Sequence, residues 1–95
     1  MAGRLRDKVA LVVGAGSVGP GWGNGKAAAV LFAREGAKVL CADVNEDAAN
    51  ETAGAIAKEG GEAKAIRADV ASHDDIRRMM AACTNAYGRI VKIKA

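Results

Sequence analysis

The stretch VALVVGAGSVGPGWGNG, from Val9 to Gly25, decides the fold of this chain. Its first part, Val9–Val13, is an unbroken run of branched and small apolar residues, which is typical of a short buried strand. A glycine-rich loop follows, and the apolar run KAAAVLFA from Lys26 onward then favours a helix that ends at Gly36. The loop carries six glycines, which are Gly14, Gly16, Gly19, Gly21, Gly23 and Gly25.

A strand, a glycine loop and a helix in this order are typical of the unit that binds a dinucleotide pyrophosphate. Glycine lets the main chain turn tightly and approach the phosphates, and the helix start offers free N–H groups and the positive end of its dipole. Residues 14–19 match GxGxxG, but a helix starting there would contain three further glycines, which disfavour it. We therefore expect Asn24 to cap the helix, which makes the loop unusually long.

The rest of the chain alternates between strand and helix patterns. Strands are predicted over Lys38–Ala42, Ala63–Ala68 and Arg89–Ile93. One helix follows Asn45 as N-cap and ends at Gly60-Gly61, and another follows Ser72 and ends at Gly88. The order βαβαβαβ implies an α/β fold, a partial Rossmann unit with a doubly wound parallel sheet, and we expect one domain over residues 1–95.

The last predicted helix has an amphipathic pattern and a capping-box sequence. Ser72 is followed by Asp75 three positions later, which resembles a capping box. Its apolar residues recur at helical spacing and predict a face turned to the core, made of Ile76, Met79, Met80, Cys83 and Tyr87.

Asp43 is the candidate ligand of the adenosine ribose. It follows a predicted strand and lies 18 positions after Gly25, near the ~20 residues expected for the acid that binds the ribose hydroxyls. A carboxylate there would repel the 2′-phosphate of NADP, and no Arg or Lys stands in the glycine loop or directly after Asp43. These observations favour NAD over NADP. The alternative is that Asp43 only stabilises the positive end of the dipole of the next helix.

Over residues of about 6–90 the chain resembles the N-terminal part of the short-chain dehydrogenase/reductase family. That family has Thr-Gly-x-x-x-Gly-x-Gly after its first strand. Here Val13-Gly14 stands for Thr-Gly and Gly23-Asn24-Gly25 for the final Gly-x-Gly, with about five residues inserted near 18–22. Longer loops of this sort also occur in the enoyl-acyl-carrier-protein reductase-like branch. Val13 replaces the threonine whose hydroxyl ties down the loop.

The resemblance implies further cofactor contacts. Asp69-Val70 matches the Asp-Val pair that borders the adenine, and Asp43 stands where NAD-preferring members carry their ribose-binding acid. Trp22 either covers the pyrophosphate or anchors the long loop on the surface. The predicted cofactor-binding residues are Gly14, Gly16, Ser17, Trp22, Gly23, Asn24, Gly25, Asp43, Val44, Asp69 and Val70.

The family's catalytic residues have no counterpart here. Its Asn-Asn-Ala-Gly, Ser and Tyr-x-x-x-Lys motifs are absent, and Tyr87 is followed four positions later by Val91 rather than Lys. We therefore predict no catalytic residue in these 95 residues. Two hypotheses remain: a truncated NAD(P)-dependent oxidoreductase, or a short non-catalytic nucleotide-binding module.

Composition excludes several other functions. The net charge of +3 is scattered and only three residues are aromatic, which argues against a nucleic-acid surface. Neither a signal peptide nor a membrane span is indicated, and we predict a cytoplasmic protein with reduced cysteines. His73 has no partners at metal-ligand spacing, so no metal site is predicted. With one helix on the second sheet face, we expect uncovered apolar strand surface there and self-association through it.

Overall fold

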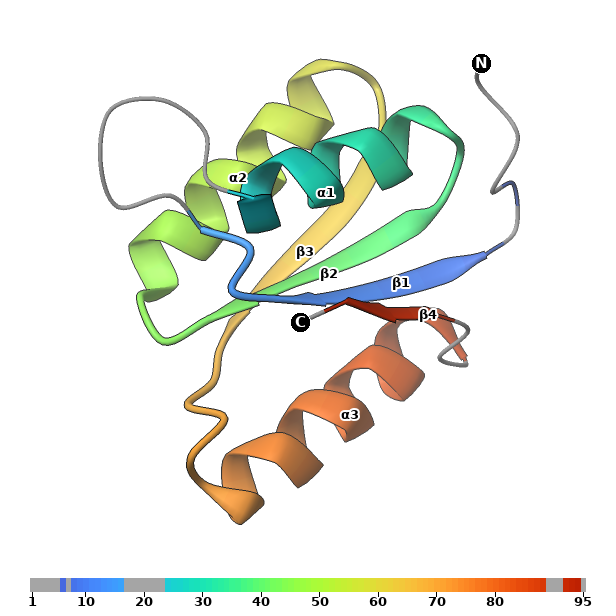
Figure 1. Cartoon of the computed structure of the whole chain (residues 1–95). Helices are drawn as coiled ribbons and strands as arrows, with labels where there is room; N and C mark the ends of the chain where they lie inside the picture. Colours follow the sequence, from blue (N-terminus) through green and yellow to red (C-terminus); the bar gives the residue numbers. More distant parts are fainter. Residues whose placement is uncertain (1–5, 7, 17–23, 89–91, 95) are drawn as a thin grey trace.

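The computed structural model describes residues 6, 8–16, 24–88 and 92–94. Its elements, shown in Figure 1, are β1 (Val9–Val13), α1 (Asn24–Arg34), β2 (Lys38–Asp43), α2 (Glu46–Lys58), β3 (Glu62–Arg67), α3 (His73–Tyr87) and β4 (Lys92–Lys94). The four strands form one parallel sheet in the order β3-β2-β1-β4. The predicted βαβαβαβ order and the α/β, Rossmann-type class are therefore confirmed.

The sheet separates two hydrophobic clusters. In Figure 1, α1 and α2 cover one face of the sheet and α3 covers the other. Ala10 and Val12 of β1 join the cluster under α1 and α2, while Val9 and Leu11 join the cluster over α3. Since successive side chains of a strand point to opposite faces, a strand buried on both sides must be apolar throughout. This explains the unbroken VALVV run.

The predicted helix ends are confirmed by their hydrogen bonds. Asn45 Oδ1 accepts the N–H of Ala48 at the start of α2, and Ser72 Oγ accepts the N–H of Asp75 at the start of α3. Gly36 and Gly88 end α1 and α3 with φ angles of 101° and 83°, a conformation that glycine adopts without a steric penalty. Local sequence therefore sets where these helices begin and end.

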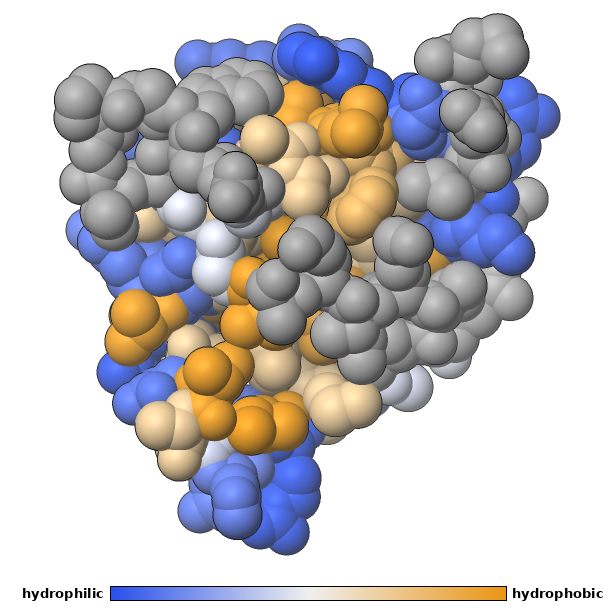
Figure 2. Space-filling view, in the orientation of Figure 1, coloured by the Kyte–Doolittle hydropathy of each residue, from blue (hydrophilic) through white to orange (hydrophobic). Residues whose placement is uncertain are grey.

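Two expectations about the α3 side were wrong. Met79 and Cys83 are buried, but Met80 is 38% exposed, because a neighbouring helical position points about 100° away. On β1 and β2, the strand surface facing α3 is also covered rather than exposed, since Val9 and Leu40 are each only 2% exposed. Figure 2 shows hydrophobic residues gathered across the middle of one side of the molecule, with hydrophilic residues around them.

Candidate functional site

The turn after β1 brings the start of α1 against the end of the strand. Gly14 has a φ of 75°, and the N–H groups of Gly14 and Ala15 both donate to the carbonyl oxygen of Ala42, at 2.8 and 3.0 Å. A Cβ on Gly25 would collide with the carbonyl group of Gly14. Glycine is therefore required at both positions, at one for its φ and at the other for the close approach of the helix.

Asp43 joins the end of β2 to this turn. Its Oδ2 accepts the N–H of Gly16 and its Oδ1 accepts the N–H of Asn45, each at 2.9 Å. A carboxylate has about four acceptor positions, so each oxygen can accept a further hydrogen bond from a hydroxyl group. The side chain is half-buried and is held in one orientation before any ligand binds.

Gly16 fills the space between Asp43 and α2. A Cβ on Gly16 would overlap the side chain of Ala48 and lie 3.1 Å from Asp43 Oδ2. The glycine therefore allows the turn, the carboxylate and the first turn of α2 to meet.

Thr52 of α2 contacts this turn, although the predicted site residues do not include it. Its hydroxyl, which is completely buried, donates to the carbonyl oxygen of Ala15 at 2.9 Å. The pair ties α2 to the glycine turn and satisfies two polar groups that would otherwise be buried without partners. A signal was present in the sequence, because Thr52 is a polar residue on the buried, alanine-rich face of α2.

Asp69 and Val70 lie at the same edge of the sheet as Asp43. The N–H of Ala68 donates to the carbonyl oxygen of Asp43 at 3.0 Å, which holds the chain leaving β3 beside the end of β2. Asp69 Oδ1 accepts the N–H of Ala71 and stabilises the next turn. Val44 and Val70 are 57% and 53% exposed, and they offer apolar surface at this edge.

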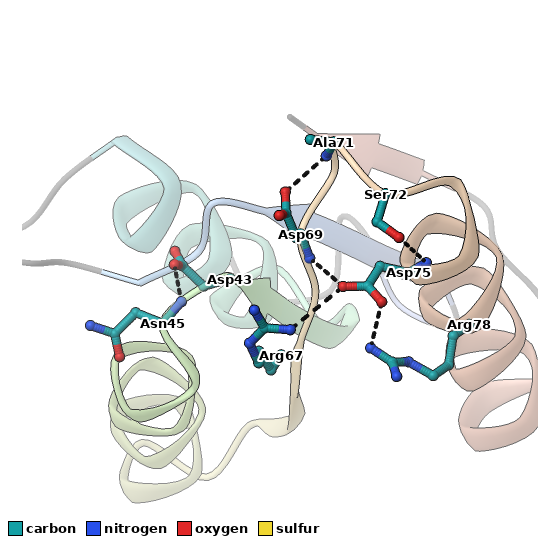
Figure 3. Close-up of polar contacts among 8 residues, drawn as sticks. All are labelled: Asp43, Asn45, Arg67, Asp69, Ala71, Ser72, Asp75 and Arg78. Atoms are coloured by element: carbon teal, nitrogen blue, oxygen red, sulfur yellow. Dashed lines mark hydrogen bonds and ion pairs between the residues drawn. The ribbon is translucent and has the colours of Figure 1, made fainter.

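Arg67 is a second residue that sequence reasoning missed. It is in register with Asp43 across the parallel pair of β2 and β3. Its Nη1 lies 3.6 Å from Asp75 Oδ2, and Figure 3 shows Arg67 between Asp43 and Asp75. In the sequence, no Arg or Lys stands in the glycine loop or directly after Asp43. Strand pairing brings one there from 24 positions further along the chain.

The remaining predicted residues are placed as follows. Ser17, Trp22 and Gly23 lie outside the described residues. Asn24 is the first residue of α1 rather than the cap before it, so the helix begins one position earlier than predicted. His73 is an exposed residue at the start of α3. Tyr87 donates to the carbonyl oxygen of Val39 at 3.3 Å, and burial raises its pKa to about 12.

Metal binding and membrane spanning find no support in the described part of the chain. Residues 6, 8–16, 24–88 and 92–94 contain no group of three or more His, Cys, Asp or Glu side chains that could hold a metal ion. Within the same residues, no helix has the length and apolar character needed to cross a bilayer.

The arrangement at the carboxyl edge of the sheet defines the class of protein. A glycine turn meets a helix start, an acid at the end of the second strand contacts that turn, and exposed valines flank the acids. From β1, the chain adds β2 and then β3 on one side, and it then returns to place β4 on the other side of β1. The direction in which successive strands are added therefore reverses at β1. Ligands of open α/β sheets bind where this reversal occurs. The class is a dinucleotide-binding Rossmann fold.

The family follows from comparison with known proteins. The sequence profile of the short chain dehydrogenase family matches residues 8–93, so the chain belongs to that family. It is 40% identical over 93 residues to the 2,5-dichloro-2,5-cyclohexadiene-1,4-diol dehydrogenase LinX of Sphingobium indicum, covering 98% of this chain and 35% of that protein. The short-chain dehydrogenase/reductase homolog YusS of Bacillus subtilis is 39% identical over 85 residues, with 88% of this chain and 73% of that protein covered.

A solved structure extends the likeness to the fold. The 7α-hydroxysteroid dehydrogenase complexed with NADH and 7-oxo glycochenodeoxycholic acid superposes with a TM-score of 0.88 at 34% identity. The match covers 95% of this chain and 33% of that one. The chain thus spans about a third of the length of LinX and of the hydroxysteroid dehydrogenase.

Proposed function

We propose that this chain is the cofactor-binding portion of an NAD-dependent oxidoreductase, and that residues 1–95 form one dinucleotide-binding domain. In the whole enzyme, hydride passes between the nicotinamide and an alcohol or carbonyl substrate, or an enoyl thioester. The observation that carries the proposal is the position of Asp43, whose carboxylate accepts the Gly16 N–H of the glycine turn at 2.9 Å.

The residues at the sheet edge fit NAD in distinct ways. Gly14, Gly16 and Gly25 leave the turn without side chains that would block a pyrophosphate at the start of α1. Asp43 has free acceptor positions for the ribose hydroxyls, and Val44 and Val70 offer apolar surface to the adenine. The full set also includes Ser17, Trp22, Gly23, Asn24 and Asp69.

The preference for NAD over NADP rests on charge. The Asp43 carboxylate would repel a 2′-phosphate, whereas it would accept hydrogen bonds from the two hydroxyls of an unmodified ribose. Arg67 is the nearby cation at this edge, and it is paired with Asp75.

Calorimetric titration of NAD into the 95-residue chain tests the proposal, with NADP as the second ligand. We expect weak binding of NAD, weaker binding of NADP, and loss of at least about tenfold in NAD affinity in Asp43→Ala. Asp47→Ala removes a nearby exposed acid from the first turn of α2 and should leave the affinity unchanged. A folded chain that ignores NAD, or equal affinities in Asp43→Ala and the unaltered chain, would contradict the proposal.

A second candidate function is a non-catalytic nucleotide-binding module. The observation that favours it is the relative YusS, of which this chain covers 73%. Translating the coding DNA beyond codon 95 in all three frames separates the two candidates. Asn-Asn-Ala-Gly, then Ser, then Tyr-x-x-x-Lys in any frame supports the oxidoreductase, and a stop without such remnants supports the module.

We infer further that the protein acts in the cytoplasm and that this chain self-associates. Two features support these inferences: Cys41 and Cys83 are buried and form no disulfide, and within the described residues β4 is an outer strand of the sheet. Sedimentation velocity over a concentration series tests self-association, and a monomer at every concentration would contradict it.

A further inference from the structure

The carboxylate of Asp75 connects three parts of the cofactor edge. Its Oδ2 accepts the main-chain N–H of Asp69 at 2.9 Å and lies 3.6 Å from Nη1 of Arg67. Its Oδ1 accepts a hydrogen bond from Nη2 of Arg78, also at 2.9 Å. Figure 3 shows the side chain between the end of β3 and the first turn of α3. Only 16% of this side chain is exposed, so its bonds face little competition from water.

Asp75 does not complete the capping box that its spacing predicts. In that motif the acid accepts the N–H of the capping residue itself. Here the Ser72 N–H donates instead to the carbonyl oxygen of Asp69, at 2.9 Å. The Asp75 carboxylate reaches further back and binds the Asp69 N–H. The acid therefore fixes the segment between β3 and α3 rather than only the start of the helix.

We propose that Asp75 is a positioning residue for the adenine end of the cofactor site. The inference rests on the proposed function, because it concerns the segment that carries Asp69 and Val70. By holding the Asp69 N–H, Asp75 keeps this segment in the conformation that exposes Val70 at the edge of the sheet. Arg67 and Arg78 hold the carboxylate from either side, so the segment is ordered before the ligand arrives.

Asp74 provides a matched control for the test. It is also an acid in the first turn of α3, and it also pairs with an arginine three positions later, at 3.2 Å from Arg77. Its side chain is 92% exposed and accepts a hydrogen bond from Arg77. Asp74→Ala therefore removes the same charge from the same helix end and leaves the Asp69 segment in place.

The experiment compares two ligands that differ by the adenine. AMP carries the base, whereas ribose 5-phosphate keeps only the ribose and phosphate that Asp43 and the glycine turn would hold. Both are titrated, with amide chemical shifts as the readout, into the unaltered chain, Asp75→Ala, Asp75→Asn and Asp74→Ala. We expect Asp75→Ala to lower the affinity for AMP by about tenfold and to leave the affinity for ribose 5-phosphate unchanged. A general loss of structure would lower the affinity for both ligands.

Asp75→Asn tests the hydrogen bond itself. Its amide oxygen can still accept the Asp69 N–H, so AMP affinity should stay within about threefold of the unaltered chain. Three results would each overturn the positioning role. The first is an AMP affinity of Asp75→Ala equal to that of Asp74→Ala, and the second is an AMP affinity of Asp75→Asn as low as that of Asp75→Ala. The third is an equal loss of affinity for AMP and for ribose 5-phosphate in Asp75→Ala. An unaltered chain that binds neither AMP nor NAD is a different result, because it overturns the proposed function and this inference together.

Discussion

Asp43 and Gly16 are separated by 27 positions in the chain, yet the carboxylate of one accepts the main-chain N–H of the other at 2.9 Å. The acid is therefore part of the glycine turn as well as a candidate ligand of the ribose. Substitutions at Asp43 act on both roles, and the two must be separated by the choice of side chain.

Asp43→Asn should shift the preference between cofactors. The amide oxygen still accepts one N–H, but the charge that repels a 2′-phosphate is gone. We expect the ratio of NAD to NADP affinity to fall about tenfold, which corresponds to about 1.4 kcal/mol. Titration of both cofactors measures the ratio, with Asp47→Ala as the charge-matched control. An unchanged ratio in Asp43→Asn would mean that Asp43 does not face the ribose.

Gly16→Ala and Gly54→Ala should change stability in opposite directions. The new Cβ at Gly16 overlaps Ala48, so we expect the free energy of unfolding to fall by about 1–3 kcal/mol. The Cβ at Gly54, in the middle of α2, meets nothing within 4 Å, and replacing a helical glycine there should add about 0.5–1 kcal/mol. Urea denaturation of both variants gives the comparison. Equal effects would show that the space at Gly16 is not restricted.

Thr52→Val should destabilise the fold although its shape is nearly unchanged. The substitution leaves the carbonyl oxygen of Ala15 buried without its donor, and we expect a loss of about 1–3 kcal/mol. Thr52→Ser keeps the hydroxyl and removes only a methyl group, so we expect the free energy of unfolding to fall by about 1 kcal/mol. If valine proved better tolerated than serine in thermal or urea unfolding, packing rather than the hydrogen bond would hold α2 to the turn.

Stability should fall as the pH rises above about 9, because of Cys41. Burial raises the pKa of this thiol from 9.0 to about 12. Between these values the unfolded chain releases its proton while the folded chain keeps it, so each unit of pH lowers the free energy of unfolding by up to about 1.4 kcal/mol. Burial also raises the pKa of Tyr87, from 10.0 to about 12, which acts in the same direction.

Urea denaturation at a series of alkaline pH values measures this slope, and Cys41→Ala is the control. The alanine variant should lose less stability per unit of pH, whatever its stability at neutral pH. Parallel slopes in the two proteins would show that the Cys41 thiol does not contribute to the loss.

The alternation of elements and their ends could be predicted because the signals are local. A capping side chain such as Asn45 or Ser72 bonds an N–H only three positions away, and a terminal glycine such as Gly36 is fixed by the helix it ends. The boundary of β2 was predicted one residue short, at Ala42. The ladder extends to Asp43, whose carbonyl oxygen accepts the N–H of Ala68.

The supporting residues of the site could not be predicted because their partners come from other elements. Thr52 bonds Ala15 across 37 positions, and Arg67 comes to lie beside Asp43 only through strand pairing. The spacing of Ser72 and Asp75 predicted a capping box. Whether the Asp75 carboxylate accepts the N–H of Ser72 or that of Asp69 depends on where the end of β3 places Asp69. Sequence patterns identified the residues expected to face the ligand, and the structure was needed to find those that hold them.

The hydrogen bond between Thr52 and Ala15 also bears on which parts of the protein can fold while the chain is still being synthesised. The hydrogen-bond partners of Gly14, Ala15 and Gly16 described above, which are Ala42, Asp43 and Thr52, belong to β2 and α2. Chains fold from the N-terminus during synthesis, and contacts close in sequence form early. A nascent chain can therefore assemble the glycine turn while α3 and β4 are still inside the ribosome.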